Sequence, residues 1–375
     1  MPVSQREAGT LSVMMKMEKH GGMLVYEDVA FHGVAELRKV PGLPGLQVQR
    51  VPEQVRVALN EKAAKRMLAP DGAEIRFVSK SDTVEVTLSC PTTTCEMIAF
   101  WGGFQDNKRH VIGNEPTTIR LTYPERVAQL RPGVCDNCDY SPNVWRLTLR
   151  GLDKHATLQF HDIQGQGLRP PNPDELPART YLAYGTSITD GFSATAMHLT
   201  YIAQTAHRLG VNLINLGSAG SAWCEPQLAD YIAARTDWDF ATLAISLNMI
   251  GGGFTVEQFH KRAGYMIDTI AGADQTRPVV CITLWPYYAD VCMNLDAPTP
   301  DQPSTLHQPE IANEYRQVLR ELVEKSSHPN LHLLSGDELL RDIDGYTIDL
   351  THPGDAGMIQ IGQHLAKKLR PITAG

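Results

Sequence analysis

The chain has 375 residues, of which 42% are hydrophobic and 20% charged, as in soluble globular proteins. This length exceeds what one hydrophobic core usually serves, so we expect two domains. The formal net charge of -8 and the lack of a Lys/Arg cluster argue against nucleic acids and anionic membranes as partners.

Targeting signals and cysteine usage indicate where the protein resides. No apolar run approaches the roughly 20 residues that span a bilayer. Residues 1–22 carry charged side chains without a continuous apolar core, which argues against a secretory signal. The 7 cysteines are odd in number and widely spread, which fits reduced thiols better than a disulfide framework. We therefore expect a cytoplasmic protein.

The first part of the chain, residues 1–167, has the pattern of a β domain. Short runs rich in Val, Ile, Thr and Phe predict strands at residues 23–29, 46–51, 55–59, 74–78, 83–88, 97–101, 118–121, 145–149 and 156–160. One helical turn is predicted at residues 61–68. Many short strands with so little helix indicate a β-sandwich of jelly-roll type.

A proline-rich segment separates this part from the rest. Residues 170–177 hold four prolines, a density that predicts a stiff, extended, non-helical tether. We place a linker at residues 168–179 and a second domain at residues 180–375.

The second part alternates strands with helices. Continuous apolar runs predict strands at residues 180–184, 212–216, 241–247, 278–285 and 331–334. Helical periodicity is found at residues 199–209, 226–234, 256–271, 309–325 and 356–369. This order predicts a parallel sheet in a three-layer α/β/α domain. A long loop with three prolines is predicted at residues 287–306.

Residues suited to acyl transfer follow the predicted strands of this part. Ser187 follows the first strand, Gly220 the second and Asn248 the third, while Asp349-Leu350-Thr351-His352 precedes the last helix. The carboxyl ends of parallel strands meet at one edge of the sheet, where such folds bind ligands.

Acyl transfer needs a nucleophile, a base, a group that orients the base, and donors for the oxyanion. Ser187 can be the nucleophile, His352 the base and Asp349 its partner. The Gly220 N–H and the Asn248 amide can serve as donors. Each residue alone is more often structural, a turn serine or a capping histidine, so the prediction depends on their combination.

These blocks resemble those of the SGNH, or GDSL-type, hydrolase superfamily. They read Gly185-Thr186-Ser187-Ile188-Thr189, Gly220, Ser246-Leu247-Asn248-Met249 and Asp349-Leu350-Thr351-His352. The resemblance implies a flavodoxin-like fold and a Ser187–His352–Asp349 triad. It also implies an oxyanion hole formed by the Ser187 N–H, the Gly220 N–H and the Asn248 side chain.

The chain departs from the superfamily pattern at three positions. Thr186 replaces an Asp, Ser246 a Gly, and Met249 a second Asp. Thr186 keeps a polar side chain in the turn, and neither of the other two positions has a catalytic role in the superfamily, so the resemblance still implies activity. The β-rich first part resembles a two-domain bacterial branch, in which several members remove small acyl groups, often acetyl, from carbohydrates.

Further residues near these blocks are candidates for substrate binding. They are His198, Cys224, Glu225, Tyr287 and Tyr288. For each, a structural role is the alternative: Cys224 as a small buried residue, His198 as a helix cap, the tyrosines as core cover. The run 251–253, three glycines, is expected to form a loop beside the site. No phosphate-binding motif is present, and no cofactor is expected.

Four cysteines allow a zinc hypothesis. Cys90, Cys95, Cys135 and Cys138 could close a tetrahedral thiolate site, although four unconnected thiols are the simpler interpretation.

The favoured function is a serine esterase acting on short-chain, chiefly acetyl, esters of small molecules or oligosaccharides. A lipase, a thioesterase or an acyltransferase would use the same triad. A glycan-binding protein with a degenerate hydrolase domain is the rival class, and the complete triad disfavours it. The sequence leaves open whether the chain forms a homo-oligomer.

Overall fold

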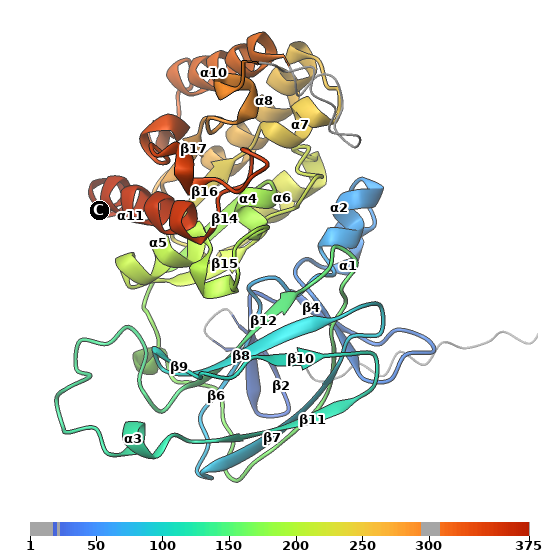
Figure 1. The fold of residues 1–375 in the computed structure, drawn as a ribbon, viewed down its shortest axis with the longest axis vertical. Coiled ribbons are helices and arrows are strands. Elements are labelled where there is room, and N and C mark those ends of the chain that lie inside the picture. Colours follow the sequence, from blue (N-terminus) through green and yellow to red (C-terminus); the bar gives the residue numbers. More distant parts are fainter. Residues whose placement is uncertain (1–17, 21–22, 294–307, 375) are drawn as a thin grey trace, which may run out of the picture.

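The computed structural model describes residues 18–20, 23–293 and 308–374. Its elements form a β-rich part followed along the chain by an α/β part, and Figure 1 shows the α/β part above the β-rich part. Among the described helices, none is both long and apolar enough to cross a membrane.

The β-rich part contains an antiparallel sheet of order β1-β2-β3-β6-β12-β8-β10, with β9 paired to β8. Its strands are β1 Glu18–His20, β2 Met23–Tyr26, β3 Val29–His32, β6 Glu74–Phe77, β8 Cys95–Trp101, β9 Phe104–Gln105, β10 His110–Ile112 and β12 Trp145–Gly151.

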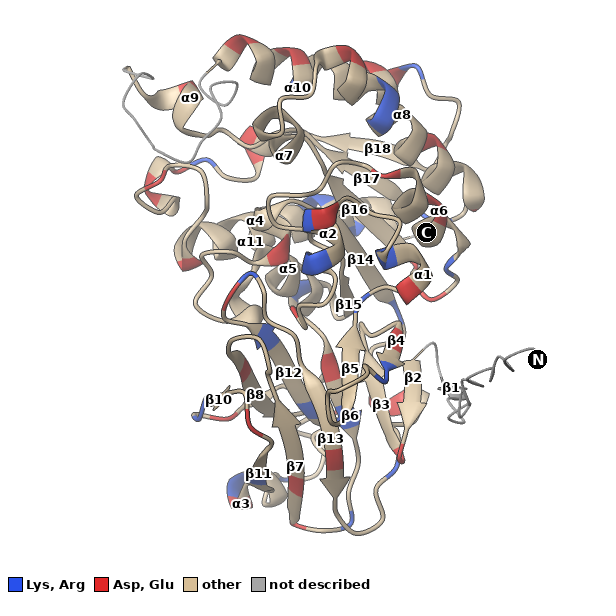
Figure 2. Cartoon of the chain, turned by 90° about the vertical axis from the view of Figure 1, so that its right-hand side faces the viewer, with Lys and Arg blue, Asp and Glu red and all other residues tan. Residues whose placement is uncertain are grey.

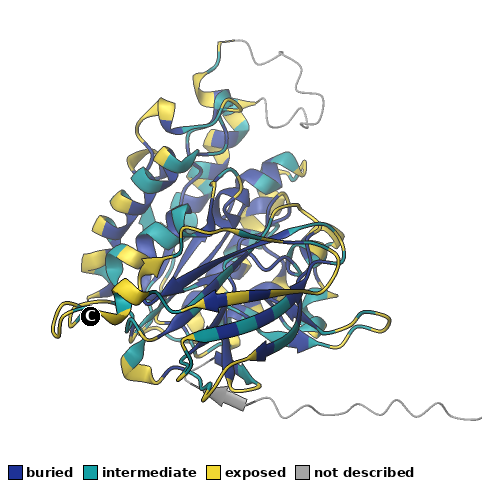
Figure 3. Cartoon of the chain, turned by 60° about the horizontal axis from the view of Figure 1, so that its bottom comes forward, coloured by how far each residue is buried: buried dark blue, intermediate teal, exposed yellow. Residues whose placement is uncertain are grey.

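A second antiparallel sheet has the order β11-β7-β13-β5-β4. Its strands are β4 Glu36–Arg38, β5 Leu46–Gln49, β7 Thr83–Ser89, β11 Thr117–Thr122 and β13 Gln159–Gln164. Both sheets contribute to one hydrophobic core, as Phe31 and Leu147 from the first and Val86 and Phe160 from the second show. Buried residues alternate with intermediate ones along β7 and with exposed ones along β11, whereas β3, β5, β6 and β8 are buried throughout (Figure 3).

One predicted strand in this part is wrong, and another is divided between two strands. The run 23–29 is interrupted by a hairpin turn at Glu27 and Asp28, whose φ angles of 48° and 62° reverse the chain between β2 and β3. The run 55–59 is not a strand, because helix α1, Glu53–Arg56, begins after Pro52. An ion pair between Glu53 and Arg56 at 2.6 Å supports that turn.

Other boundaries in this part differ from the prediction. The strand expected at 156–160 begins at Gln159 and continues to Gln164. A bulge between Phe160 and Asp162 interrupts the alternation of side chains, so the sequence pattern does not show the second half of this strand. The predicted helical turn is present as α2, Glu61–Arg66, which Asn60 caps by accepting from the Ala63 N–H. Helix α3, Glu125–Ala128, was not predicted.

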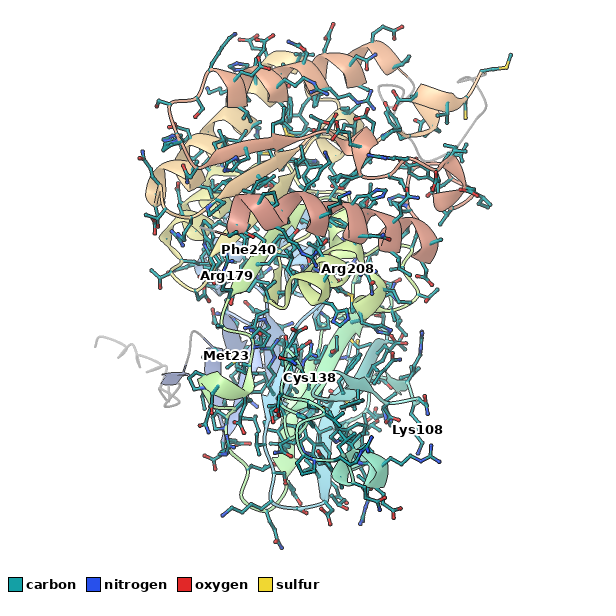
Figure 4. The ribbon with its side chains drawn as sticks, turned by 90° about the vertical axis from the view of Figure 1, so that its left-hand side faces the viewer. Met23, Lys108, Cys138, Arg179, Arg208 and Phe240 are labelled. Atoms are coloured by element: carbon teal, nitrogen blue, oxygen red, sulfur yellow. The ribbon has the colours of Figure 1, made fainter. Side chains whose placement is uncertain are left out.

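The proline-rich segment is more structured than an extended tether. Residues Pro173–Glu175 form a 3-10 helix, which proline tolerates at its first position because no N–H is needed there. Arg169 pairs with Glu175 at 2.7 Å, and its backbone pairs with Val78 of the β-rich part. Beyond it, Arg179 lies over the Phe240 ring at 5.5 Å, at the end of the α/β part nearest the β-rich part (Figure 4).

The predicted parallel sheet is confirmed. Its order is β15-β14-β16-β17-β18, the flavodoxin-like order, and every pair is parallel. The strands are β14 Thr180–Gly185, β15 Asn212–Asn215, β16 Phe240–Ala244, β17 Val279–Ile282 and β18 Leu331–Leu334. The third and fourth are shorter than predicted, because the chain leaves the sheet before residues 247 and 285.

Helices cover both faces of this sheet, as expected. Helices α5 Tyr201–Leu209 and α11 Asp355–Thr373 share one core, and α6 Pro226–Ala234, α8 Val256–Ala273 and α10 Pro309–Glu324 share another. Short helices that were not predicted are α4 Ser187–Asp190, α7 Leu247–Gly251 and α9 Tyr288–Val291. The last lies in the predicted loop 287–306, most of which is outside the described residues.

The buried side chain of Arg50, which follows β5, joins the two parts. Its guanidinium donates to the carbonyl of Asn215 at 3.3 Å, at the end of β15, and to that of Gly217 at 2.9 Å, just beyond the strand. It also lies 3.4 Å from Asp190, the last residue of α4. Burial, followed by the charge of Asp71, raises the pKa of Asp190 to about 7. The β-rich part thus contacts the helix that begins with Ser187.

Replacing Arg50 with methionine should lower the free energy of unfolding by about 3–5 kcal/mol, because the buried carbonyls and Asp190 lose their partner. Chemical denaturation measures this loss. Arg120→Met is the matched control: its ion pair with Glu85 is exposed, so stability should change by less than about 0.5 kcal/mol. Equal effects of the two substitutions would contradict a joining role for Arg50.

Candidate active site

Ser187 lies at the first position of α4, directly after β14. Gly185 makes this abrupt strand-to-helix turn possible, since a Cβ there would lie 2.8 Å from the carbonyl oxygen of Ala244 in the neighbouring strand. As the first helical residue, Ser187 has an N–H without a partner inside the helix. The strand order reverses beside β14, so Ser187 sits at the topological switch point of the sheet.

The structure brings the three predicted triad residues together. Oγ of Ser187 lies 2.7 Å from Nε2 of His352, and Nδ1 of His352 lies 2.7 Å from Oδ2 of Asp349. Both distances are within hydrogen-bond range. A carboxylate can only accept, so the network assigns the imidazole proton to Nδ1 and leaves Nε2 to accept from the serine hydroxyl.

Asp349 is held in place by the turn that separates it from His352. Its Oδ1 accepts from the N–H groups of Thr351 and His352, each at 2.9 Å, and from the Thr347 hydroxyl at 2.8 Å. Burial would raise the pKa of Asp349, but the hydrogen bonds from His352 and Thr351 outweigh it and hold the pKa well below its usual range. The carboxylate therefore stays ionised beside the imidazole.

Donors for an oxyanion lie at two other strand ends. Gly220 has a φ of +69°, a conformation that glycine adopts without strain, and within the described residues its N–H donates no hydrogen bond. Oδ1 of Asn248 accepts from the N–H groups of Ser221 at 3.1 Å and Ala222 at 3.2 Å. The amide is thereby oriented, and its Nδ2 makes no hydrogen bond to the described part of the chain.

A cavity of about 290 Å³ holds these groups. Its described lining is Lys62, Arg66, Ser187, Phe192, Ala219, Gly220, Trp223, Leu247, Asn248, Gly251, Gly252, Tyr288, Thr351 and His352. Gly251 and Gly252 lie beside the site as predicted. The exposed Phe192 packs on the His352 ring with centroids 4.7 Å apart.

Of the residues predicted to bind substrate, only Tyr288 lines this cavity. Cys224 is fully buried, and burial raises the pKa of its thiol, so it stays protonated in the core. Glu225 is buried and bonded to Asn60, and Tyr287 is buried in the same core as Cys224. His198 lines a different cavity, of about 510 Å³, and packs against Phe100 at 5.6 Å.

The departures from the superfamily blocks lie outside this lining. Met249 is buried in the hydrophobic core, and Thr186 and Ser246 are buried beside the strand ends.

The structure gives no support to the zinc hypothesis. Cys90 and Cys95 are buried in the β core, Cys138 is exposed on the segment before β12, and no three ligand-type side chains gather within the described ranges.

Replacing Asn248 with aspartate should reduce kcat by at least the 10²- to 10³-fold, about 2.7–4 kcal/mol, typical of losing one oxyanion donor. Aspartate keeps the acceptor for Ser221 and Ala222 but replaces the amide donor with a negative oxygen. Asn248→Ala should lose a similar amount while also freeing the two N–H groups. Unchanged kcat values with p-nitrophenyl acetate would remove Asn248 from the site.

Residues 179–370 match the GDSL-like Lipase/Acylhydrolase family, and the match covers more than half of the chain. The chain belongs to this family. The predicted superfamily membership is confirmed, and the triad positions all lie within the matched segment. No curated protein matches the sequence.

Several solved structures share the fold. Salicylyl-acyltransferase SsfX3 from a tetracycline biosynthetic pathway is 16% identical, with a TM-score of 0.71, and the match covers 92% of this chain and 95% of that one. For a GDSL-like lipase from Bacteroides ovatus the values are 18%, 0.63, 86% and 91%. For the acetyl xylan esterase Est2A from the rumen bacterium Butyrivibrio proteoclasticus they are 12%, 0.54, 92% and 96%. The likeness extends over both parts of the chain.

Proposed function

We propose that this family member is a serine esterase that hydrolyses short-chain acyl esters, with acetyl as the preferred acyl group and a carbohydrate as the alcohol. The observation that carries the proposal is the continuous hydrogen-bonded chain from Ser187 through His352 to Asp349 at the switch point of the sheet.

In the first half of the reaction, Oγ of Ser187 attacks the ester carbonyl while Nε2 of His352 takes its proton. The carbonyl oxygen becomes an oxyanion that the Ser187 N–H, the Gly220 N–H and Nδ2 of Asn248 can bind. Asp349 stabilises the imidazolium that forms. The imidazolium then protonates the departing alcohol, which leaves an acyl group on Ser187.

In the second half, His352 deprotonates a water molecule that attacks the acyl-enzyme. The carboxylic acid leaves, and the proton returns to Ser187. The same acyl-enzyme would react with an acceptor alcohol instead of water, and SsfX3, which shares the fold, is named as an acyltransferase. Acyl transfer is therefore the second candidate activity.

The shape of the cavity supports a short acyl group. Its volume of about 290 Å³ is at the lower end for ligand pockets, and Ala219, Gly220, Gly251 and Gly252 provide small walls beside Ser187. The fold shared with an acetyl xylan esterase supports the carbohydrate alcohol.

We also infer the domain division 1–167, 168–179 and 180–375, with a β-sandwich of jelly-roll type as the first domain. The shared core of its two sheets and the start of the family match at residue 179 support this division.

A series of p-nitrophenyl esters from acetate to octanoate, run beside acetylated and deacetylated xylo-oligosaccharides, tests the proposal. We expect kcat/KM to be highest for acetate and to fall with chain length, with release of acetate from the sugar. A maximum at octanoate would contradict the short-chain assignment. A transferred product, formed when acceptor alcohols are added, would identify a transferase.

A further inference from the structure

Helix α2 brings two cationic side chains from the β-rich part to the cavity that holds Ser187. Lys62 and Arg66 both line this cavity. They are four residues apart, so they project from the same face of the helix. Figures 1 and 2 both show α2 extending away from the sheets to lie alongside the α/β part. The third cation of this helix, Lys65, pairs instead with Glu61 at 2.8 Å.

Arg66 is anchored beside the oxyanion donors. Its Nε donates to the carbonyl of Ala219 at 3.0 Å, and Ala219 directly precedes Gly220. The carbonyl of Arg66 accepts from the buried Arg50 guanidinium at 2.7 Å. These two hydrogen bonds fix helix α2 to both parts of the chain. The Arg66 guanidinium has further N–H donors besides the one that it donates to Ala219.

Lys62 and Arg66 form a cationic wall of the cavity, and no carboxylate in the described lining neutralises it. None of the described residues that line the cavity is acidic. Lys62 is exposed and forms no ion pair within the described part of the chain. Asp190 also attracts Arg66, but it is buried, and Arg50 is the guanidinium within ion-pair distance of it. On a chain of net charge -8, the wall is a local positive site in a concave surface.

We propose that the natural ester carries a carboxylate or a phosphate, which Lys62 and Arg66 bind while Ser187 attacks the ester carbonyl. This inference rests on the proposed esterase function and narrows its substrate class to anionic esters. The Arg66 guanidinium can form directed hydrogen bonds to such a group, and the Lys62 ammonium can act as a mobile point charge. An anion on the alcohol is compatible with acetyl as the acyl group, whereas an anion on the acyl side would replace acetyl with a longer, charged acyl group.

Matched pairs of esters separate these two sources. Mono-p-nitrophenyl glutarate against p-nitrophenyl pentanoate places the charge on the acyl side. The p-acetoxybenzoate anion against its methyl ester places it on the alcohol side. We expect the wild-type protein to have the higher kcat/KM for the anionic member of at least one pair, and added salt should reduce that preference.

Lys62→Met should reduce the preference for the anion by about three- to fivefold, the effect of one exposed charge pair, mainly through KM. Adding Arg66→Met should reduce it further. Lys65→Met, which removes the same charge from the same helix away from the cavity, is the control and should leave the preference unchanged. Equal rates for both members of both pairs, or an equal effect of Lys65→Met, would overturn the proposal.

A binding measurement keeps this test independent of the reaction. Titration calorimetry of Ser187→Ala with p-acetoxybenzoate, with glutarate monomethyl ester and with their uncharged methyl esters needs no turnover. Tighter binding of an anion, weakened about three- to fivefold by Lys62→Met in the same background, would support the anion site even if no ester were hydrolysed. Equal binding of charged and uncharged ligands would overturn it. Absence of hydrolysis with intact anion binding would instead refute the esterase proposal.

Discussion

Replacing Ser187 with alanine should reduce kcat for p-nitrophenyl acetate by about 10³-fold or more, because the acyl-enzyme can no longer form. Oγ of Ser187 is the atom within 2.7 Å of Nε2 of His352. Loss of the hydroxyl therefore removes the nucleophile while leaving the base and the oxyanion donors. Initial rates at saturating ester, with correction for spontaneous hydrolysis, measure the effect.

Ser193→Ala is the matched control for this substitution. Ser193 lies in the loop after α4 and is absent from the cavity lining, so its removal should leave kcat near the wild-type value. Circular dichroism and a thermal melt establish that both variants are folded. Wild-type rates in folded Ser187→Ala would show that another group is the nucleophile.

Replacing Asp349 with asparagine should also reduce kcat by about 10³-fold or more, with little change in size at the site. The carboxylate accepts from Nδ1 of His352 at 2.7 Å. An asparagine that turns its amide towards Nδ1 would favour the opposite tautomer, whose Nε2 carries a proton and cannot accept one from Ser187. Single-turnover and steady-state rates with an activated ester measure the loss.

The pH dependence of the wild-type protein complements this variant. Hydrogen bonds hold the pKa of Asp349 well below its usual range, so its carboxylate remains charged throughout the pH range of an esterase assay. The kcat/KM of the wild-type protein should rise with pH, because a general base acts only in its unprotonated form, and ionisation of Asp349 should add no second rise. A flat profile from about pH 5 to about pH 9 would contradict a histidine base.

The juxtaposition of Ser187, His352 and Asp349 could be predicted because it follows from local pattern and sheet topology. Ser187, Gly220 and Asn248 each follow an apolar strand, and parallel strands place their carboxyl ends at one edge. Asp349 and His352 lie in one short turn, and backbone N–H groups of this turn donate to the Asp349 carboxylate. This arrangement does not depend on distant parts of the chain.

The rest of the cavity could not be predicted in this way. Cys224 was predicted, but the adjacent Trp223 lines the cavity; of the two predicted tyrosines, Tyr288 lines the cavity and Tyr287 does not. Neighbouring side chains leave the backbone in different directions, so one enters the cavity and the next enters the core. An error of a single position therefore exchanges a binding residue for a core residue.

The cationic wall lies even further from what sequence shows. Lys62 and Arg66 are more than a hundred residues from Ser187, on a short helix whose charges look like those of any solvated surface. Only the docking of α2, through Arg50 and Ala219, places them at the site. Similarly, the exposed ring of Phe192 lies beside the site only because the His352 ring packs against it in the folded chain.

Covalent labelling with a fluorophosphonate tests most directly that Ser187 is the nucleophile of this site. Attack by Oγ on phosphorus expels fluoride and leaves a stable phosphonyl ester, which intact-mass spectrometry and peptide mapping detect. We expect one phosphonyl group per chain, located on Ser187, with parallel loss of esterase activity and no label on Ser187→Ala. A label on a different residue, or full esterase activity after complete labelling of Ser187, would contradict the proposed mechanism.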